Sequence, residues 1–207
     1  MKLVIFDCDG TLVDSELLCN LALERQLAEI GVECKAKALL DKFRGYKLSS
    51  IFASLESEFS ISLPESFESE YRYKVGELFD EHLKPNPGVK EVLESLSIPF
   101  CIASSAPREK INRALSVTGL DGYFDSNIFS SYEVGSWKPE PKLFLHAANA
   151  MGFNPEDCCV VEDSLLGLEA ASNAKMKAVY YAPKVAKQNY LGAVQIQNMS
   201  ELVEIIT

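Results

Sequence analysis

The stretch Leu3-Val4-Ile5-Phe6-Asp7-Cys8-Asp9-Gly10-Thr11-Leu12-Val13-Asp14-Ser15 contains an apolar run that leads directly into carboxylates and hydroxyls. The apolar run is short and partly β-branched, which is typical of a strand buried on both faces. Asp7 and Asp9 then lie at the C-terminal end of that strand, where open α/β sheets bind their ligands. Because the two aspartates are two residues apart, both can line one pocket while Cys8 points into the protein. Gly10 permits a tight or left-handed backbone, so the chain can turn away without filling the pocket.

The residue types in this stretch favour phosphoryl transfer. An aspartate is a weak nucleophile unless its target is strongly electrophilic and charge repulsion is relieved, which indicates an aspartyl-phosphate formed beside a metal ion. A second carboxylate nearby can act as general acid and then as general base. The alternative interpretation is structural, because Asp-x-Asp-Gly is also common in turns and calcium loops. No Asp-rich ladder with a closing Glu follows, so the sequence does not predict an EF-hand.

Composition and charge narrow the class of protein. With 207 residues, 47% of them hydrophobic, the chain is long enough for one substantial core and a small second domain. No apolar run approaches the roughly 20 residues of a membrane span, and the N-terminus has no signal-peptide pattern, so we expect a cytoplasmic protein. The net charge of −10 argues against nucleic acid or an anionic membrane as partner. The six cysteines lack paired metal spacing, which favours buried reduced thiols over disulfides or zinc ligands.

The segment from residue 16 to residue 84 contains only helical patterns. Apolar spacing and start or stop signals predict helices over about 17–32, 36–43, 48–59 and 66–83. Because strand patterns occur only outside this segment, we predict a helical domain of residues 16–84 inserted into a core of residues 1–15 and 85–207. The expected hinges are residues 14–16 and 84–88.

Beyond residue 88, apolar runs alternate with helical patterns. We predict strands over 99–103, 123–129, 158–161, 177–181 and 194–196. The helices predicted between and after them cover 89–96, 110–117, 141–151 and 200–206. Strands separated by helices predict an α/β fold with a Rossmann-like parallel sheet and right-handed crossovers.

Hydroxyl and ammonium groups follow two of these strands. Ser104 and Ser105 come at the end of strand 99–103, and Pro107 suits the first turn of the next helix, so a hydroxyl and backbone N–H groups can meet an anion. Lys138 precedes a proline, which favours an extended backbone just outside a helix. An ammonium group held there can neutralise a phosphate.

Adjacent carboxylates end the strand predicted over 158–161. Glu162 and Asp163 repel each other unless a cation compensates them, which indicates a divalent metal site. Their hard oxygen donors suit Mg²⁺ rather than zinc.

Cationic residues also occur where a ligand would need them. In the stretch 43–47, Arg44 and Lys47 flank Gly45 between two predicted helices, which is either a solvated turn or a loop that contacts an anionic or polyol part of the substrate. Arg108, just after the Ser104 turn, either adds charge near the substrate or faces solvent.

Taken in order, the segments Asp7-x-Asp9-Gly10-Thr11, Ser104-Ser105, Lys138-Pro139 and Glu162-Asp163 resemble the four motifs of the haloacid dehalogenase (HAD) superfamily, mostly metal-dependent phosphatases. The resemblance covers essentially the whole chain. The inserted helices are similar to the helical cap of the subfamily that includes phosphoglycolate phosphatases and β-phosphoglucomutase.

The resemblance implies a role for each matching residue. It makes Asp7 the nucleophile and Asp9 the general acid and base, with Thr11 orienting Asp9. The Ser104 hydroxyl, the Ser105 amide and the Lys138 ammonium would neutralise the phosphoryl group. Mg²⁺ would be held by Asp7, the backbone carbonyl of Asp9 and Asp163, with Glu162 either a ligand or a neighbour of one.

The cap loop and the segment around Lys138 resemble bacterial 6-phosphogluconate phosphatases of this family, which implies a phosphosugar acid as substrate. The expected partner is therefore a small phosphorylated metabolite, and we expect a monomer, with a weak homo-oligomer as the alternative.

Three other functions stay open. The family's phosphosugar mutases carry a cap Arg at a position that falls on Leu48 here, which favours hydrolysis. A haloacid dehalogenase needs neither metal nor phosphate, whereas Asp9 and the acidic pair suit both. A non-catalytic phosphoaspartate switch is the alternative of another class, but receiver domains place their acidic pair at the first strand and the phosphorylated Asp later.

Overall fold

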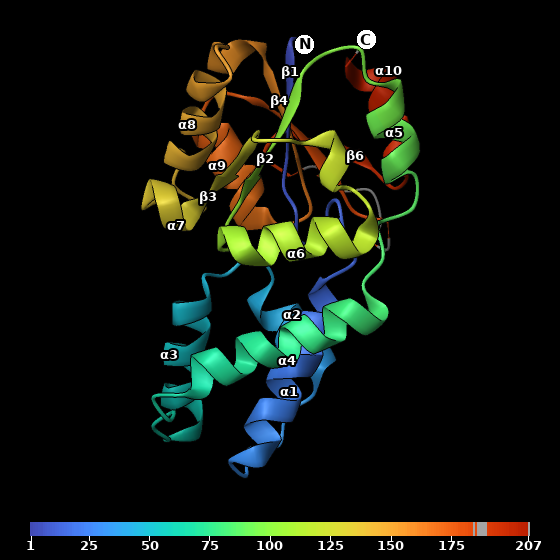
Figure 1. Ribbon diagram of the computed structural model, residues 1–207. Coiled ribbons are helices and arrows are strands. Elements are labelled where there is room, and N and C mark those ends of the chain that lie inside the picture. Colours follow the sequence, from blue (N-terminus) through green and yellow to red (C-terminus); the bar gives the residue numbers. More distant parts are fainter. Residues whose placement is uncertain (184, 186–189, 207) are drawn as a thin grey trace.

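Six strands among the described residues form one parallel sheet (Figure 1). The computed structural model describes residues 1–183, 185 and 190–206, so the predicted core of 85–207 includes positions outside that set. The sheet order is β3-β2-β1-β4-β5-β6, the doubly wound order, which confirms the predicted Rossmann-like fold. The strands are β1 (Leu3–Phe6), β2 (Phe100–Ser104), β3 (Ile128–Ser130), β4 (Cys158–Glu162), β5 (Lys177–Tyr181) and β6 (Val194–Ile196).

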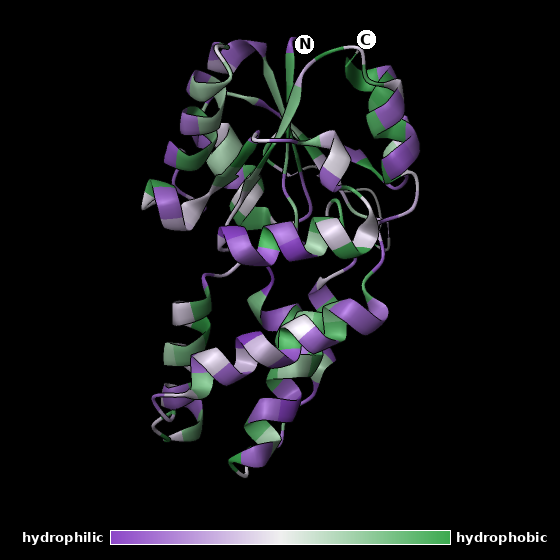
Figure 2. Cartoon of the chain, in the orientation of Figure 1, coloured by the Kyte–Doolittle hydropathy of each residue, from purple (hydrophilic) through white to green (hydrophobic). Residues whose placement is uncertain are grey.

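Helices cover both faces of this sheet, as the fully buried strand β1 requires. Alternate residues of β1 belong to different cores because successive side chains point to opposite faces. Leu3 and Ile5 pack in one core with α8 (Lys142–Ala150) and α9 (Leu165–Asn173). Val4 and Phe6 pack in the other, with α5 (Val89–Ser95), α6 (Arg108–Thr118) and α10 (Leu202–Ile206). Figure 2 shows the hydrophobic strands between helices that are polar on part of their surface.

A group of helices lies beyond the C-terminal ends of the strands, below α6 in Figure 1. It consists of α1 (Glu16–Glu29), α2 (Ala36–Phe43), α3 (Leu48–Phe59) and α4 (Phe67–His82). Helix α1 packs against α2 and α4, and the group buries Leu27, Leu55, Phe67 and Phe79. Each helix in the described part of the chain is too short or too polar to cross a bilayer.

The two chain connections to this helical group run side by side. The Asp14 amide donates to the Lys84 carbonyl at 3.0 Å, and Val13 forms an isolated antiparallel bridge with Pro85. The helical group is therefore joined to the sheet through one paired linker, close to the residues that follow β1.

The segment 123–129 differs from the predicted strand. Its first residue ends a short 3₁₀ helix, η1 (Asp121–Tyr123), and only β3 at its end is extended. Asp125 has φ of 44°, a left-handed conformation that interrupts a strand. The prediction also missed the short helices α7 (Ser131–Val134) and η2 (Pro155–Asp157). The predicted helix 200–206 is present as a 3₁₀ turn, η3 (Met199–Glu201), that continues into α10.

Candidate active site

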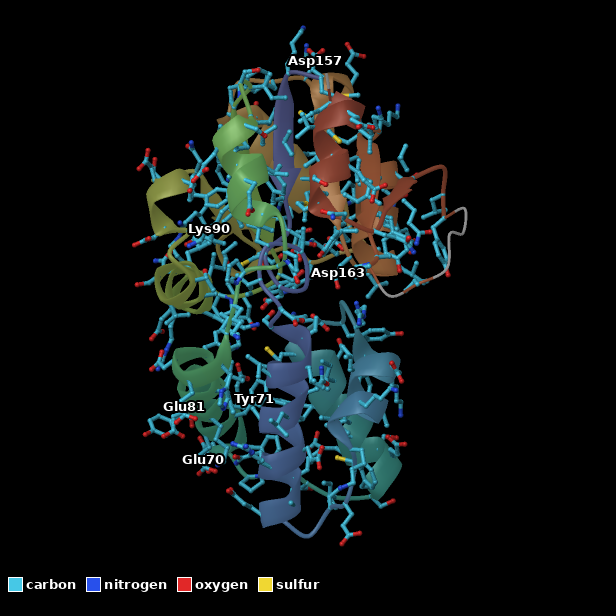
Figure 3. All side chains as sticks on the ribbon, turned by 90° about the vertical axis from the view of Figure 1, so that its right-hand side faces the viewer. Glu70, Tyr71, Glu81, Lys90, Asp157 and Asp163 are labelled. Atoms are coloured by element: carbon cyan, nitrogen blue, oxygen red, sulfur yellow. The ribbon has the colours of Figure 1, made fainter. Side chains whose placement is uncertain are left out.

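Three buried carboxylates meet where β1 and β4 end. The strands pair Phe6 with Val161, so the residues that follow each strand are neighbours. Asp7, Glu162 and Asp163 each offer an oxygen within 4.8 Å of the other two. Figure 3 shows Asp163 at the end of the sheet that faces the helical group.

Lys138 is inserted between two of these carboxylates. Its Nζ lies 2.5 Å from Asp7 Oδ1 and 2.5 Å from Glu162 Oε1, and only 3% of its side chain is exposed. Burial lowers the pKa of Lys138, but the attraction of the two carboxylates outweighs it and raises the pKa above its ordinary value. The side chain is therefore a fixed positive charge beside Asp7.

Two cations, Lys138 and the Arg44 guanidinium at Asp163, do not compensate the three carboxylates of this cluster. Burial raises the pKa of Asp7 to about 8, Glu162 adds to the rise, and Lys138 opposes it. The pKa of Asp163 is also well above its usual range, because of burial first and then repulsion by Glu16 and Glu162. A divalent cation would relieve this excess of negative charge.

The donor set fits such a cation. Asp7, Glu162 and Asp163 offer hard carboxylate oxygens, which suit Mg²⁺. The loop after β1 also passes unusually close to Asp163. Gly10 has φ of 79°, and a Cβ at this position would lie 2.3 Å from Asp163 Oδ2, so only glycine allows this approach.

Asp9 is held by two residues that the sequence did not single out for it. Ser15 Oγ donates to its Oδ1 at 2.6 Å, and Lys110 Nζ donates to its Oδ2 at 2.8 Å. Burial raises the pKa of Asp9, but Lys110 and Ser15 together bring it below its usual value. Thr11 Oγ1 is buried and has no hydrogen-bond partner among the described residues.

A third unpredicted residue fixes the loop after β1. Asn86 Nδ2 donates at 2.9 Å to the carbonyls of both Gly10 and Thr11. Asn86 lies between two prolines of the returning linker, a pattern that predicted a hinge and gave no sign of this contact.

Ser104 ends β2 beside the acidic cluster. It is buried, and its Oγ accepts from the Ala106 amide at 3.2 Å. Ser105 follows it and lines the same cavity. Arg108, at the start of α6, is instead bound to Glu133 and to the Ile128 carbonyl, and it does not line this cavity.

The loop between α2 and α3 touches the end of β4. Arg44 Nη1 lies 3.0 Å from Asp163 Oδ2, and Lys47 Nζ lies 3.6 Å from the centroid of the Trp137 ring. Gly45 has φ of 79°, and a Cβ there would lie 2.7 Å from Ser164 Cβ. The predicted specificity loop is thus packed directly against the acidic end of the sheet.

A cavity of about 490 Å³ lies between the sheet and the helical group. Asp7, Asp9, Ser104, Lys138 and Asp163 line its inner end. Lys110 of α6 lines the same end beside Asp9. Side chains of α1, the 43–47 loop, α3 and α4 line the part toward the helical group, including Asn20, Lys47, Ser69, Tyr71 and Arg72 and the apolar Leu23, Ile51 and Val75. Tyr71 is labelled on the helical group in Figure 3. The volume lies in the range of pockets that bind small molecules.

Comparison with known proteins identifies, over most of the chain, the same family that the sequence motifs resemble. The haloacid dehalogenase-like hydrolase family matches residues 4–181. A 6-phosphogluconate phosphatase from Escherichia coli (strain K12) is 35% identical over 182 residues, which are 87% of this chain and 82% of that protein. A phosphorylated carbohydrates phosphatase from Thermotoga maritima is 32% identical, covering 87% of this chain and 84% of its own.

A solved structure agrees. The haloacid dehalogenase-like protein of unknown function from Agrobacterium tumefaciens superposes with a TM-score of 0.84 at 31% identity, covering 100% of this chain and 97% of that one. The predicted resemblance, and with it the prediction of an enzyme, is confirmed: the chain belongs to the haloacid dehalogenase-like hydrolase family.

Proposed function

We propose that the protein is a Mg²⁺-dependent phosphatase that hydrolyses phosphomonoesters of small sugars or sugar acids, with 6-phosphogluconate as the leading substrate. The observation that carries the proposal is the Lys138 ammonium between Asp7 and Glu162, at the inner end of a cavity that Asp9 also lines. A buried carboxylate with an adjacent fixed cation and a second carboxylate nearby is suited to attack on phosphorus.

In the first step an oxygen of Asp7 attacks phosphorus, and the bond from phosphorus to the ester oxygen breaks. Asp9 gives its proton to that oxygen, so the sugar leaves as an alcohol and the phosphoryl group stays on Asp7. The arriving phosphate raises the pKa of Asp9 by like-charge repulsion, which favours the protonated form that this step needs. In the second step Asp9 takes a proton from water, the water oxygen bonds to phosphorus, and Asp7 leaves as a carboxylate.

The remaining site residues would compensate the negative charge of the phosphoryl group or hold the metal ion. The Lys138 ammonium, the Ser104 hydroxyl and the Ser105 amide would bind the phosphoryl oxygens as negative charge shifts among them. Asp7, Asp163 and Glu162 would hold Mg²⁺, with the Asp9 carbonyl as a further ligand. The ion would supply electrostatic stabilisation of the transferring group.

The substrate class rests on the cavity and on the relatives. Two matched proteins are named for 6-phosphogluconate and for phosphorylated carbohydrates. The cavity volume suits a phosphorylated sugar acid, and Lys47 and Arg72 supply positive charge in the part toward the helical group. We propose that residues 16–84 form a cap that closes over the substrate, with the loop at Gly45 and Lys47 contacting its far end. Arg44 of this loop does not line the cavity and is paired with Asp163 instead.

The test is a panel of phosphosugars, phosphosugar acids, nucleotides and phosphoglycolate, scored for Mg²⁺-dependent phosphate release. We expect release by the wild type, strongest for a phosphosugar acid, and none above background by Asp7→Asn. Asp14→Asn is the matched control, because Asp14 is an exposed aspartate of the same stretch. Equal turnover by wild type and Asp7→Asn would refute the mechanism. Conversion of a glucose phosphate to its isomer without phosphate release would identify a mutase instead.

A further inference from the structure

Lys110 reaches the reacting groups from the sheet side of the cavity. It lies in the first turn of α6, and its Nζ donates to Asp9 Oδ2 at 2.8 Å. Its side chain is 23% exposed, and it lines the cavity. Because α6 belongs to the part of the chain that contains the sheet, Lys110 stays beside Asp9 whatever the position of the helical group.

The surroundings of Lys110 leave donor capacity for a ligand. An ammonium has three N–H donors; Asp9 accepts one, and the Cys19 side chain is a second hydrogen-bond partner, which leaves one for a ligand. The aromatic ring of Phe79 lies on the helical side, with its centroid 5.6 Å from Nζ, and Tyr71 is a further neighbour. The ammonium is largely enclosed by these side chains, where a hydrogen bond to a ligand oxygen is stronger than in water.

Lys110 differs from the two arginines that line the cavity in the carboxylate with which it is paired. Arg72 and Arg113 line the cavity too, but they are paired with Glu68 and Asp80 of helix α4. Lys110 is paired with Asp9, the residue that would meet the ester oxygen of the substrate.

The position fixes which substrate atom Lys110 reaches. This step rests on the proposed function, in which the ester oxygen lies within about 3 Å of an Asp9 oxygen. Nζ is 2.8 Å from Asp9 Oδ2, so an ester oxygen that meets Oδ2 lies within about 6 Å of Nζ. An oxygen on the carbon next to the ester carbon can then bridge this separation with a hydrogen bond to Nζ.

We propose that Lys110 binds a hydroxyl or carboxylate oxygen on the carbon adjacent to the ester carbon, and so selects phosphomonoesters of polyols and hydroxy acids over simple alkyl phosphates. The contact comes from the sheet side and acts independently of the loop at Arg44, Gly45 and Lys47.

The experiment compares two esters that differ only in this oxygen, glycerol 3-phosphate and 1,3-propanediol monophosphate, as substrates of wild type and Lys110→Met. A hydrogen bond to a charged group contributes roughly 1.5–3 kcal/mol, so its loss corresponds to roughly 10- to 150-fold in kcat/KM. We expect Lys110→Met to lose at least about tenfold more on glycerol 3-phosphate than on 1,3-propanediol monophosphate. Lys110→Arg, which keeps the charge and the donors, should recover part of this difference.

Two controls separate the outcomes. Lys74→Met makes the same change on α4, where Lys74 pairs with Glu29 outside this cavity, and should leave both substrates unaffected. Thermal denaturation shows that each variant is folded. Equal losses on both esters would mean that Lys110 acts only by orienting Asp9, and would overturn this inference alone, as would no loss on either. Phosphate release from the phosphosugar panel but from neither ester by the wild type would overturn this inference alone, and no release from the panel either would overturn the proposed function with it.

Discussion

Gly45→Ala tests whether the loop between α2 and α3 must pack against the end of β4 for catalysis. Gly45 has φ of 79°, and an added Cβ would lie 2.7 Å from Ser164 Cβ and 2.8 Å from Ser164 Oγ. Ser164 immediately follows Asp163 and caps α9, so it has little freedom to move. The loop would have to retreat from the acidic cluster by about 1 Å to reach ordinary van der Waals contact.

Two terms set the size of the effect. A left-handed backbone costs an alanine about 1–2 kcal/mol relative to glycine. Forcing an extra carbon into a packed contact costs about 1–3 kcal/mol more. The backbone term lowers stability whatever the loop position, and only the contact term of about 1–3 kcal/mol acts against the closed arrangement, which corresponds to about a 5- to 150-fold loss of kcat/KM.

The measurement is kcat/KM for 6-phosphogluconate, together with the midpoint of thermal unfolding. Gly31→Ala is the matched control, because Gly31 also has φ of 79° but no atom lies within 4 Å of its added Cβ. We expect both variants to lose similar stability from backbone strain and only Gly45→Ala to lose activity. If the kcat/KM of Gly45→Ala stays within about threefold of that of Gly31→Ala, the contact with Ser164 is not part of catalysis.

Three further predictions concern the charges of the site. Lys138→Met should lower kcat by about 10²–10³, because the transferring group loses its fixed cation; a loss below tenfold would contradict this role. Glu16 has its pKa raised to about 7, by burial and then by Asp9, so its ionisation destabilises the folded state as pH rises from about 4.5 to 7. In the presence of a chelator, Glu16→Gln should therefore be more stable than wild type at pH 8 by roughly 1–2 kcal/mol, and no more stable near pH 4, in chemical denaturation. Adding Mg²⁺ to the metal-free wild type, at about a hundred times its dissociation constant, should raise the free energy of unfolding by about 2.7 kcal/mol. A similar rise in Asp163→Asn at the same Mg²⁺ concentration would count against Asp163 as a metal ligand.

The sequence determined those features that depend on local periodicity. The buried run before Asp7 and the alternation of apolar runs with helical patterns predicted the parallel sheet, which the structure confirms. Helix α3 has the predicted bounds of 48–59, because an apolar repeat is a property of a few consecutive turns. The composition of the stretch 123–129 gave no sign that Asp125 would take a left-handed conformation, and there the strand prediction was too long.

Only the tertiary structure decided which charged side chains meet. Lys138 and Asp7 are 131 residues apart, and their contact follows from the docking of a loop against the end of β1. Arg108 and Lys110 are separated by about 200° around α6, so they lie on opposite flanks of its buried stripe. The apolar repeat of the sequence locates the buried stripe of α6, but it does not determine which side of the stripe faces the cavity. Packing of the helix between the sheet and the helical group directs Lys110 to Asp9 and Arg108 to Glu133, because side-chain direction depends on how a helix is rotated against its neighbours.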